Sequence, residues 1–72
     1  MKINTVNVVE MTDDYTMSIN SFEDNEDGNK EANSMFTKCA LENGCSNEDV
    51  DSFIEDGYFE QGTYQLFIIH SS

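Results

Sequence analysis

The chain has 72 residues and carries fifteen Asp and Glu against three Lys and no Arg, a formal net charge of −12. A chain this short forms one domain, residues 1–72, and buries only about 60% of its unfolded surface, so we expect modest stability. The charge argues against nucleic acid or an anionic membrane as a direct partner, because binding phosphate needs clustered Lys and Arg. It favours a basic protein surface, toward which this charge would steer association, although acidic residues also serve solubility.

The cysteine content and the apolar segments predict the compartment. Cys39 and Cys45 are too few for a disulfide framework, and no signal-peptide pattern follows Met1, so we expect a reducing cytoplasm. No apolar run approaches the roughly 20 residues that span a bilayer. Five Phe and three Tyr, together with clear periodic segments, favour a folded domain over disorder.

The first two segments predict a β-hairpin. Residues 3–11 are rich in β-branched side chains and form a strand with Val6 and Val8 on one face and Val9 and Met11 on the other. Residues 12–14 form a turn. Residues 15–22 then alternate apolar and polar side chains, which is typical of a half-buried antiparallel partner.

The middle of the chain predicts two helices. Residues 23–30 are polar and contain Gly28, so a well-formed helix is not expected there, although Asp24, Asn25 or Asp27 could cap a helix start. A helix that ends near Asn43, before a stop at Gly44, follows from an apolar stripe at helical spacing. The stripe consists of Ala32, Met35, Phe36, Cys39 and Ala40.

The second helix is predicted to start at Ser46, whose hydroxyl can accept from a backbone N–H three residues on, and to end at Gly57. Its buried side consists of Val50, Phe53 and Ile54.

The closing strand is predicted over residues 63–70, the longest apolar run, and both of its faces are apolar. Tyr64, Leu66 and Ile68 lie on one face, and Phe67 and Ile69 lie on the other. Residues 58–62 can pair briefly with this strand around a turn at Gln61 and Gly62.

These elements predict an α+β domain in the order β-β-α-α-β, with a three-stranded antiparallel or mixed sheet and both helices on one face. The first strand is expected between the other two, because it and the last strand are the most apolar. Helices in so small a protein cover one face of the sheet. The second face is therefore expected to meet another molecule or to remain an exposed apolar patch.

No pattern predicts an enzyme, a metal site or a cofactor. An alignment of Gly28 with the glycine of a calcium loop puts Ser34 where a bidentate Glu is required. The spacing of Cys39 and Cys45 differs from zinc and redox motifs, and the single histidine, His70, is distant in sequence. Nothing around His70 supplies the rest of a nucleophilic site.

The whole chain resembles the small acidic proteins that bacteriophages encode against host machinery, among them anti-CRISPR proteins and nucleic-acid mimics. The resemblance rests on small size, the absence of Pro and Trp, the excess of Asp and Glu, and an element order that ends in Tyr-Gln-Leu-Phe-Ile-Ile-His-Ser. It implies a non-enzymatic inhibitor that acts in the host cytoplasm and blocks a basic, nucleic-acid-binding surface of a host defence complex.

In this hypothesis acidic side chains steer the protein and approximate a run of phosphate charge, and exposed aromatics anchor it. The expected partner-binding residues are Glu23, Asp24, Glu26, Asp27, Glu48, Asp49, Asp51, Glu55, Asp56, Tyr58, Phe59 and Phe67, and Glu31 and Glu60 extend the two acidic groups.

A second hypothesis is a structural or assembly module. In it two copies form a homodimer through the uncovered sheet face, which would contain Val9, Phe67 and Ile69.

Overall fold

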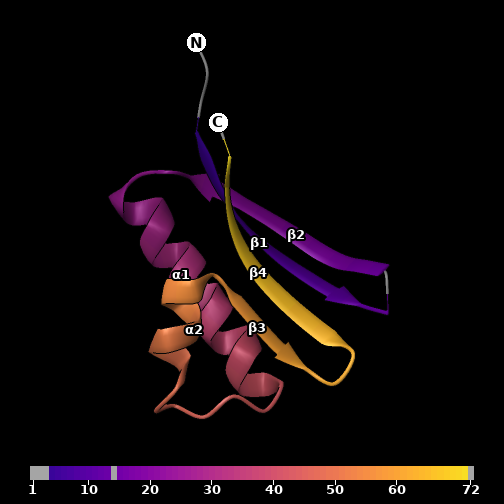
Figure 1. Cartoon of the computed structure of the whole chain (residues 1–72). Helices are drawn as coiled ribbons and strands as arrows, with labels where there is room; N and C mark the ends of the chain where they lie inside the picture. Colours follow the sequence, from indigo (N-terminus) through magenta and orange to yellow (C-terminus); the bar gives the residue numbers. More distant parts are fainter. Residues whose placement is uncertain (1–3, 14, 72) are drawn as a thin grey trace.

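Two helices pack on one face of a four-stranded antiparallel sheet in the computed structural model, which describes residues 4–13 and 15–71 (Figure 1). The α+β class and the placement of both helices on one face are confirmed. The predicted start of the first strand at Ile3, and Asp14 in the first turn, lie outside the described residues. The elements are β1 (Thr5–Thr12), β2 (Tyr15–Glu23), α1 (Glu26–Glu42), α2 (Val50–Asp56), β3 (Tyr58–Gln61) and β4 (Tyr64–Ser71).

The strand order is β2-β1-β4-β3, so the first strand does lie between the hairpin partner and the closing strand. The predicted count of three strands was wrong, because Tyr58–Gln61 forms a strand of its own. β3 pairs with β4 across a tight turn in which Gln61 faces Tyr64. Gly62 has φ 61°, a left-handed conformation that glycine adopts without a steric penalty and that short hairpin turns require.

The core lies between α1 and the inward side chains of the central strands. Val6, Val8 and Leu66 of the sheet and Phe36 of α1 are fully buried. The apolar stripe predicted for the first helix is confirmed, because Ala32 and Ala40, one turn on either side of Phe36, are also fully buried. Beneath α2, Phe53 meets Phe59 edge to face, with ring centroids 5.1 Å apart.

Helix α1 begins at Glu26, earlier than the sequence predicts. Asn25 is its N-cap, and the Asn25 side-chain oxygen accepts a hydrogen bond of 2.7 Å from the Gly28 backbone N–H. Glu26 and Asp27 lie in the first turn, where the helix dipole favours negative charge. The expectation of an irregular segment over 23–30 was therefore wrong, since capping and charge offset the low helix propensity of glycine.

Both predicted helix ends are confirmed, but the predicted start of the second helix is not. Asn43 is the C-cap of α1, and Gly57 ends α2 with φ 73°. Ser46 does not cap α2, because its hydroxyl donates to the Asp49 carboxylate at 2.9 Å. A turn precedes the helix, which begins at Val50.

Among the described residues, neither helix combines the length and apolar character needed to cross a lipid bilayer.

Candidate functional site

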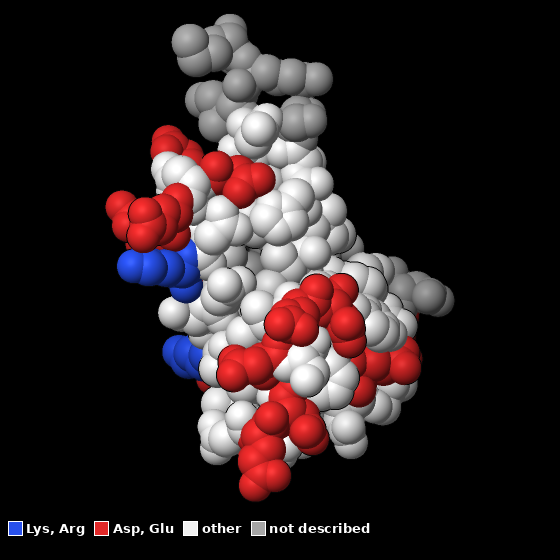
Figure 2. All heavy atoms as spheres, turned by 60° about the vertical axis from the view of Figure 1, so that its left-hand side comes forward, with Lys and Arg blue, Asp and Glu red and all other residues white. Residues whose placement is uncertain are grey.

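Eleven of the fifteen Asp and Glu residues form two groups, and Figure 2 shows red areas at the upper left and the lower centre with white surface and blue lysine surface between them. All members of both groups are exposed. The α1 acidic group, at the end of β2 and the start of α1, consists of Glu23, Asp24, Glu26, Asp27 and Glu31. The α2 acidic group, on and around α2, consists of Glu48, Asp49, Asp51, Glu55, Asp56 and Glu60.

The α1 acidic group takes part in bonds that hold the fold together. The Asp24 carboxylate accepts from the Asn29 amide at 2.8 Å and lies 3.1 Å from Nδ1 of His70 at the end of β4. The hydrogen bond from Asn29, and then the contact with His70, lower the pKa of Asp24 below its ordinary value. Lys30 lies 3.9 Å from Glu26 one turn along α1. Part of this charge is therefore used within the molecule, and His70 has a structural contact.

The α2 acidic group is not neutralised. Within the described residues, no Lys or His nitrogen lies within 4 Å of any of its six carboxylates. Glu55 and Asp56 are the last two residues of α2, where the helix dipole disfavours negative charge. Asp51 and Glu55 are four residues apart, so their Cβ atoms lie about 5–6 Å apart on one side of the helix. This end of the molecule therefore presents concentrated negative charge to solvent.

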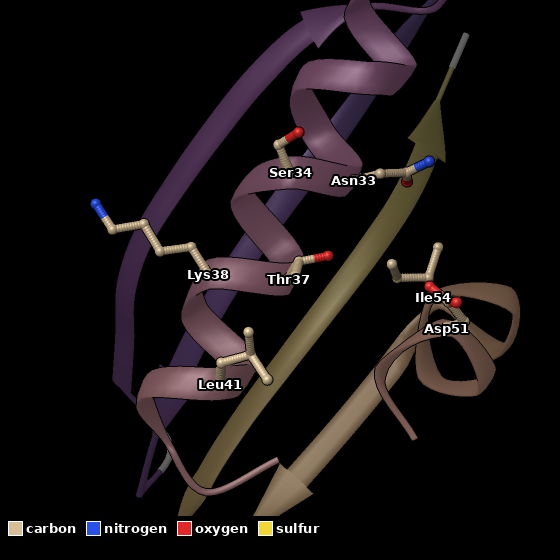
Figure 3. A pocket seen from close by; sticks show the side chains of 7 residues that line it. All are labelled: Asn33, Ser34, Thr37, Lys38, Leu41, Asp51 and Ile54. Carbon is tan, nitrogen blue, oxygen red and sulfur yellow. The ribbon is translucent and has the colours of Figure 1, made fainter. Parts of the chain in front are cut away.

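An open groove of about 670 Å³ runs between α1 and α2 and reaches the α2 acidic group (Figure 3). Its apolar residues, Leu41 and Ile54, are half-buried, and Asp51 lies on the α2 side. Lys38 projects from α1 away from α2. The remaining lining residues are Asn33, Ser34 and Thr37.

The three predicted aromatic anchors do not share one surface. Phe59 is only 4% exposed, in the core beneath α2, so the expectation that it is an exposed anchor was wrong. Its neighbour Tyr58 points to the opposite face of the sheet, as successive strand residues do, and its ring packs against Phe67 with centroids 5.0 Å apart. The expected pairing of residues 58–62 with the closing strand is confirmed, but the sequence did not fix which face of that strand the helices cover, so it could not decide which aromatic would be buried.

We call the sheet face that carries no helices the open face. Strand register places one apolar residue from each strand in a single row across it, in the order Ile19, Val9, Phe67 and Tyr58. Ile69 lies on the same face, two residues along β4 from Phe67. The expectation that Val9, Phe67 and Ile69 share the uncovered face is therefore confirmed.

A polar network that the sequence analysis missed lies on the helix-covered face. The Glu10 carboxylate accepts from the Ser18 hydroxyl at 2.6 Å and from the Tyr64 hydroxyl at 2.7 Å. The hydrogen bond from Ser18, and then that from Tyr64, lower the pKa of Glu10. Burial, and then the neighbouring Glu10 carboxylate, raise the pKa of Tyr64. One signal was available, because Glu10 continues the alternation of Val6 and Val8 and so falls on their face.

This network does not supply a nucleophile at neutral pH. Burial, and then the neighbouring Glu10 carboxylate, raise the pKa of the adjacent Cys39 thiol from 9.0 to about 11. The thiolate is the reactive form of cysteine, so Cys39 stays protonated and unreactive. Tyr64 likewise keeps its proton, as the donor to Glu10.

Alkylation can test this assignment. We expect iodoacetamide at pH 8 to modify Cys39 about tenfold more slowly than Cys45. A pKa of about 11 leaves Cys39 with about 100-fold less thiolate than an ordinary cysteine, and burial and then the Asp49 charge raise the pKa of Cys45 as well, which narrows the difference between the two. Mass spectrometry of peptides measures both rates, and unfolding in urea should make them similar. Equal rates in the folded protein would contradict the shielding of Cys39.

The calcium-loop alignment does not correspond to a loop. The segment 23–34 is the end of β2, a short connection and the first turns of α1. Over residues 4–13 and 15–71, no three side chains of His, Cys, Asp or Glu are grouped so as to hold a metal ion.

No family model, curated protein or solved structure matches this chain. The features that bear on function are therefore the two acidic groups, the groove between the helices and the open face.

Proposed function

We propose that this chain is a non-enzymatic binding protein that covers a basic, nucleic-acid-binding surface of a host defence complex, as small phage inhibitors do, in the host cytoplasm. The observation that carries the proposal is the α2 acidic group, which has six exposed carboxylates and no cationic partner among the described residues. Charge that the fold leaves unpaired is available to a partner of opposite sign.

The cost of this arrangement to the protein supports a role in binding. Neighbouring carboxylates repel one another, and Glu55 and Asp56 oppose the dipole of α2, so each is expected to destabilise the helix slightly. Natural sequences tolerate such local conflicts at functional sites. Solubility alone would be served equally well by charges placed where the helix dipole favours them.

The spacing of the carboxylates supports mimicry of nucleic acid. Asp51 and Glu55 repeat negative charge along one side of α2, at a separation of the same order as successive phosphates along a DNA strand. The groove beside them offers Leu41 and Ile54 as apolar contacts for a side chain of the partner. Acidic residues would set the association rate and the orientation, and the apolar contacts would slow dissociation.

A matched pair of charge-reversal variants tests the proposal. Glu48→Lys with Asp51→Lys alters the α2 acidic group, and Glu31→Lys with Glu42→Lys alters exposed residues of α1. Each pair changes the formal net charge from −12 to −8. We expect the first pair to weaken binding at least tenfold and the second pair to weaken it much less, with both variants folded by circular dichroism.

The partner is first captured from a bacterial lysate on the immobilised protein and identified by mass spectrometry, and its affinity is then measured at 50 and 300 mM salt. We expect the affinity to fall at least tenfold with salt and DNA to compete for the same surface. A partner that binds no nucleic acid, or a complex insensitive to salt, would contradict the proposal. Equal loss in both variants would contradict the assignment to α2.

A further inference from the structure

We propose that the open face joins two copies of this chain into a homodimer. The inference is independent of the proposed function, because it rests on the opposite side of the sheet from the helices. The apolar row of Ile19, Val9, Phe67 and Tyr58 spans all four strands. Ile19 is 61% exposed and Ile69 is 46% exposed, and grouped exposed apolar residues often mark an interaction surface.

The polar side chains around Asn7 on the open face are already hydrogen bonded within that face. The Asn7 amide nitrogen donates to the Ile69 carbonyl at 3.0 Å and to the Ser71 hydroxyl at 3.1 Å. The Asn7 side-chain oxygen accepts from Ser21 at 2.6 Å. Because these groups have partners within the face, covering them leaves few unsatisfied donors or acceptors, which is the condition for burial at low cost.

The distribution of charge favours a second copy as the occupant. By strand register, the only carboxylates of the described strands on this face are Glu23 and Glu60. Both described lysines are on α1. A basic partner would therefore gain little from this face, whereas a second copy presents the same uncharged apolar row. Two copies, each with a net charge of −12, can also approach through this face with few carboxylates of one copy close to carboxylates of the other.

The positions of those two carboxylates suit a two-fold dimer. Glu23 pairs with Thr5 at one end of the sheet on β2, and Glu60 pairs with Gln65 toward the other end on β3, so they occupy opposite corners. A two-fold axis that lies in the plane of the interface can run parallel to the apolar row or perpendicular to it. Either axis packs the apolar row of one copy against the same row of the other copy. In both cases the corner carboxylates of one copy avoid those of the partner. This face is therefore complementary to itself, as a two-fold interface requires.

The size of the face predicts a weak dimer. Four strands about 4.8 Å apart and about seven residues long at 3.3 Å each cover roughly 450 Å² per copy. A standard stable interface buries about 800 Å² per partner. We therefore expect dissociation in the micromolar range rather than an obligate dimer.

Sedimentation velocity of the full chain from 5 to 500 μM, at 50 and 500 mM salt, tests the proposal. We expect a dimer whose affinity increases at least threefold with salt, because salt screens the repulsion between two acidic copies. This response has the opposite sign to that expected for a basic partner. A monomer at 500 μM in both salts would overturn the proposal.

Two variants of equal charge locate the interface. Ile19→Asp places a carboxylate in the apolar row at an exposed position outside the core, and Ser34→Asp adds the same charge on α1. We expect Ile19→Asp to weaken the dimer at least tenfold and Ser34→Asp to change it little, with both folded. A dimer that Ile19→Asp leaves intact would overturn the assignment to the open face. The Ile19→Asp variant should still capture a basic partner, because its α2 acidic group is unchanged. The dimer proposal and the proposed function can therefore fail separately.

Discussion

Replacing Gly28 with alanine should lower the free energy of unfolding by about 2–3 kcal/mol, the cost of overpacking at a site that cannot relax freely. Gly28 is buried in the first turn of α1, and a Cβ atom there would lie 1.7 Å from the backbone oxygen of Glu23 at the end of β2. Avoiding the clash requires the backbone of β2 or α1 to move, which also strains the Asn25 cap. Helix propensity alone predicts the opposite sign, a gain of about 1 kcal/mol.

Urea denaturation followed by circular dichroism measures this effect. Ser34→Ala is the matched control, because Ser34 is exposed on the same helix and should be neutral or slightly stabilised by alanine. An increase in stability on Gly28→Ala would mean that α1 does not approach the end of β2 as closely as the structure has it. The close approach of α1 to the end of β2, rather than a preference for a turn, is thus the reason that residue 28 is glycine.

Replacing Tyr64 with phenylalanine should lower the free energy of unfolding by about 1.5–3 kcal/mol at pH 7, the range for a hydrogen bond to a charged group. The Tyr64 ring would remain in the core, but Glu10 would lose the 2.7 Å bond from the Tyr64 hydroxyl and keep that from Ser18. Tyr15→Phe is the control, since Tyr15 is 73% exposed at the start of β2 and a change there should have little effect. Similar costs for both variants would contradict a special role for the Glu10 network.

The same variant gives a pH dependence with a defined sign. The pKa of Glu10 in the folded protein is lowered from its ordinary value of 4.5, so its ionised form is stabilised by folding. This contribution is fully present above about pH 4.5 and is lost as the pH falls through the lowered value. The stability difference between wild type and Tyr64→Phe should therefore narrow between pH 6 and pH 3. A constant or growing difference would contradict the assignment.

The comparison between two variants is necessary because the total charge has the opposite effect. Protonating many of the fifteen carboxylates relieves repulsion in the folded protein, so the wild type alone need not lose stability on acidification. The difference between two proteins of the same charge removes this common contribution. It leaves the part that depends on the Tyr64 hydroxyl.

The two proposed surfaces divide the molecule by chemistry. The side of α2 presents unpaired charge, for which salt is expected to weaken binding, and the open face presents apolar residues, for which salt is expected to strengthen pairing. A dimer through the open face would leave both acidic groups accessible except for Glu23 and Glu60, which lie at corners of that face. The resulting particle would carry twice the negative charge to a basic partner.

The sequence by itself determined the elements whose pattern repeats several times. Alternation over β1 and β2, and helical spacing of the apolar stripe through Phe36, were sufficient for the strands, the hairpin and the core of α1. Gly57 likewise marked the end of α2. These features are local, because each depends on residues that are neighbours in sequence or on one face.

Tertiary structure alone decided the features that depend on distant partners. The sequence allowed residues 58–62 to pair with the closing strand, but the packing of α2 over β3, where Phe53 meets Phe59, decided that Phe59 and not Tyr58 is buried. Glu10 is tolerated on the covered face because Tyr64, 54 residues away, donates to it. The apolar row of the open face exists only through the register of four strands. Pairing between distant segments is not encoded in local periodicity, which is why the sequence left these features open.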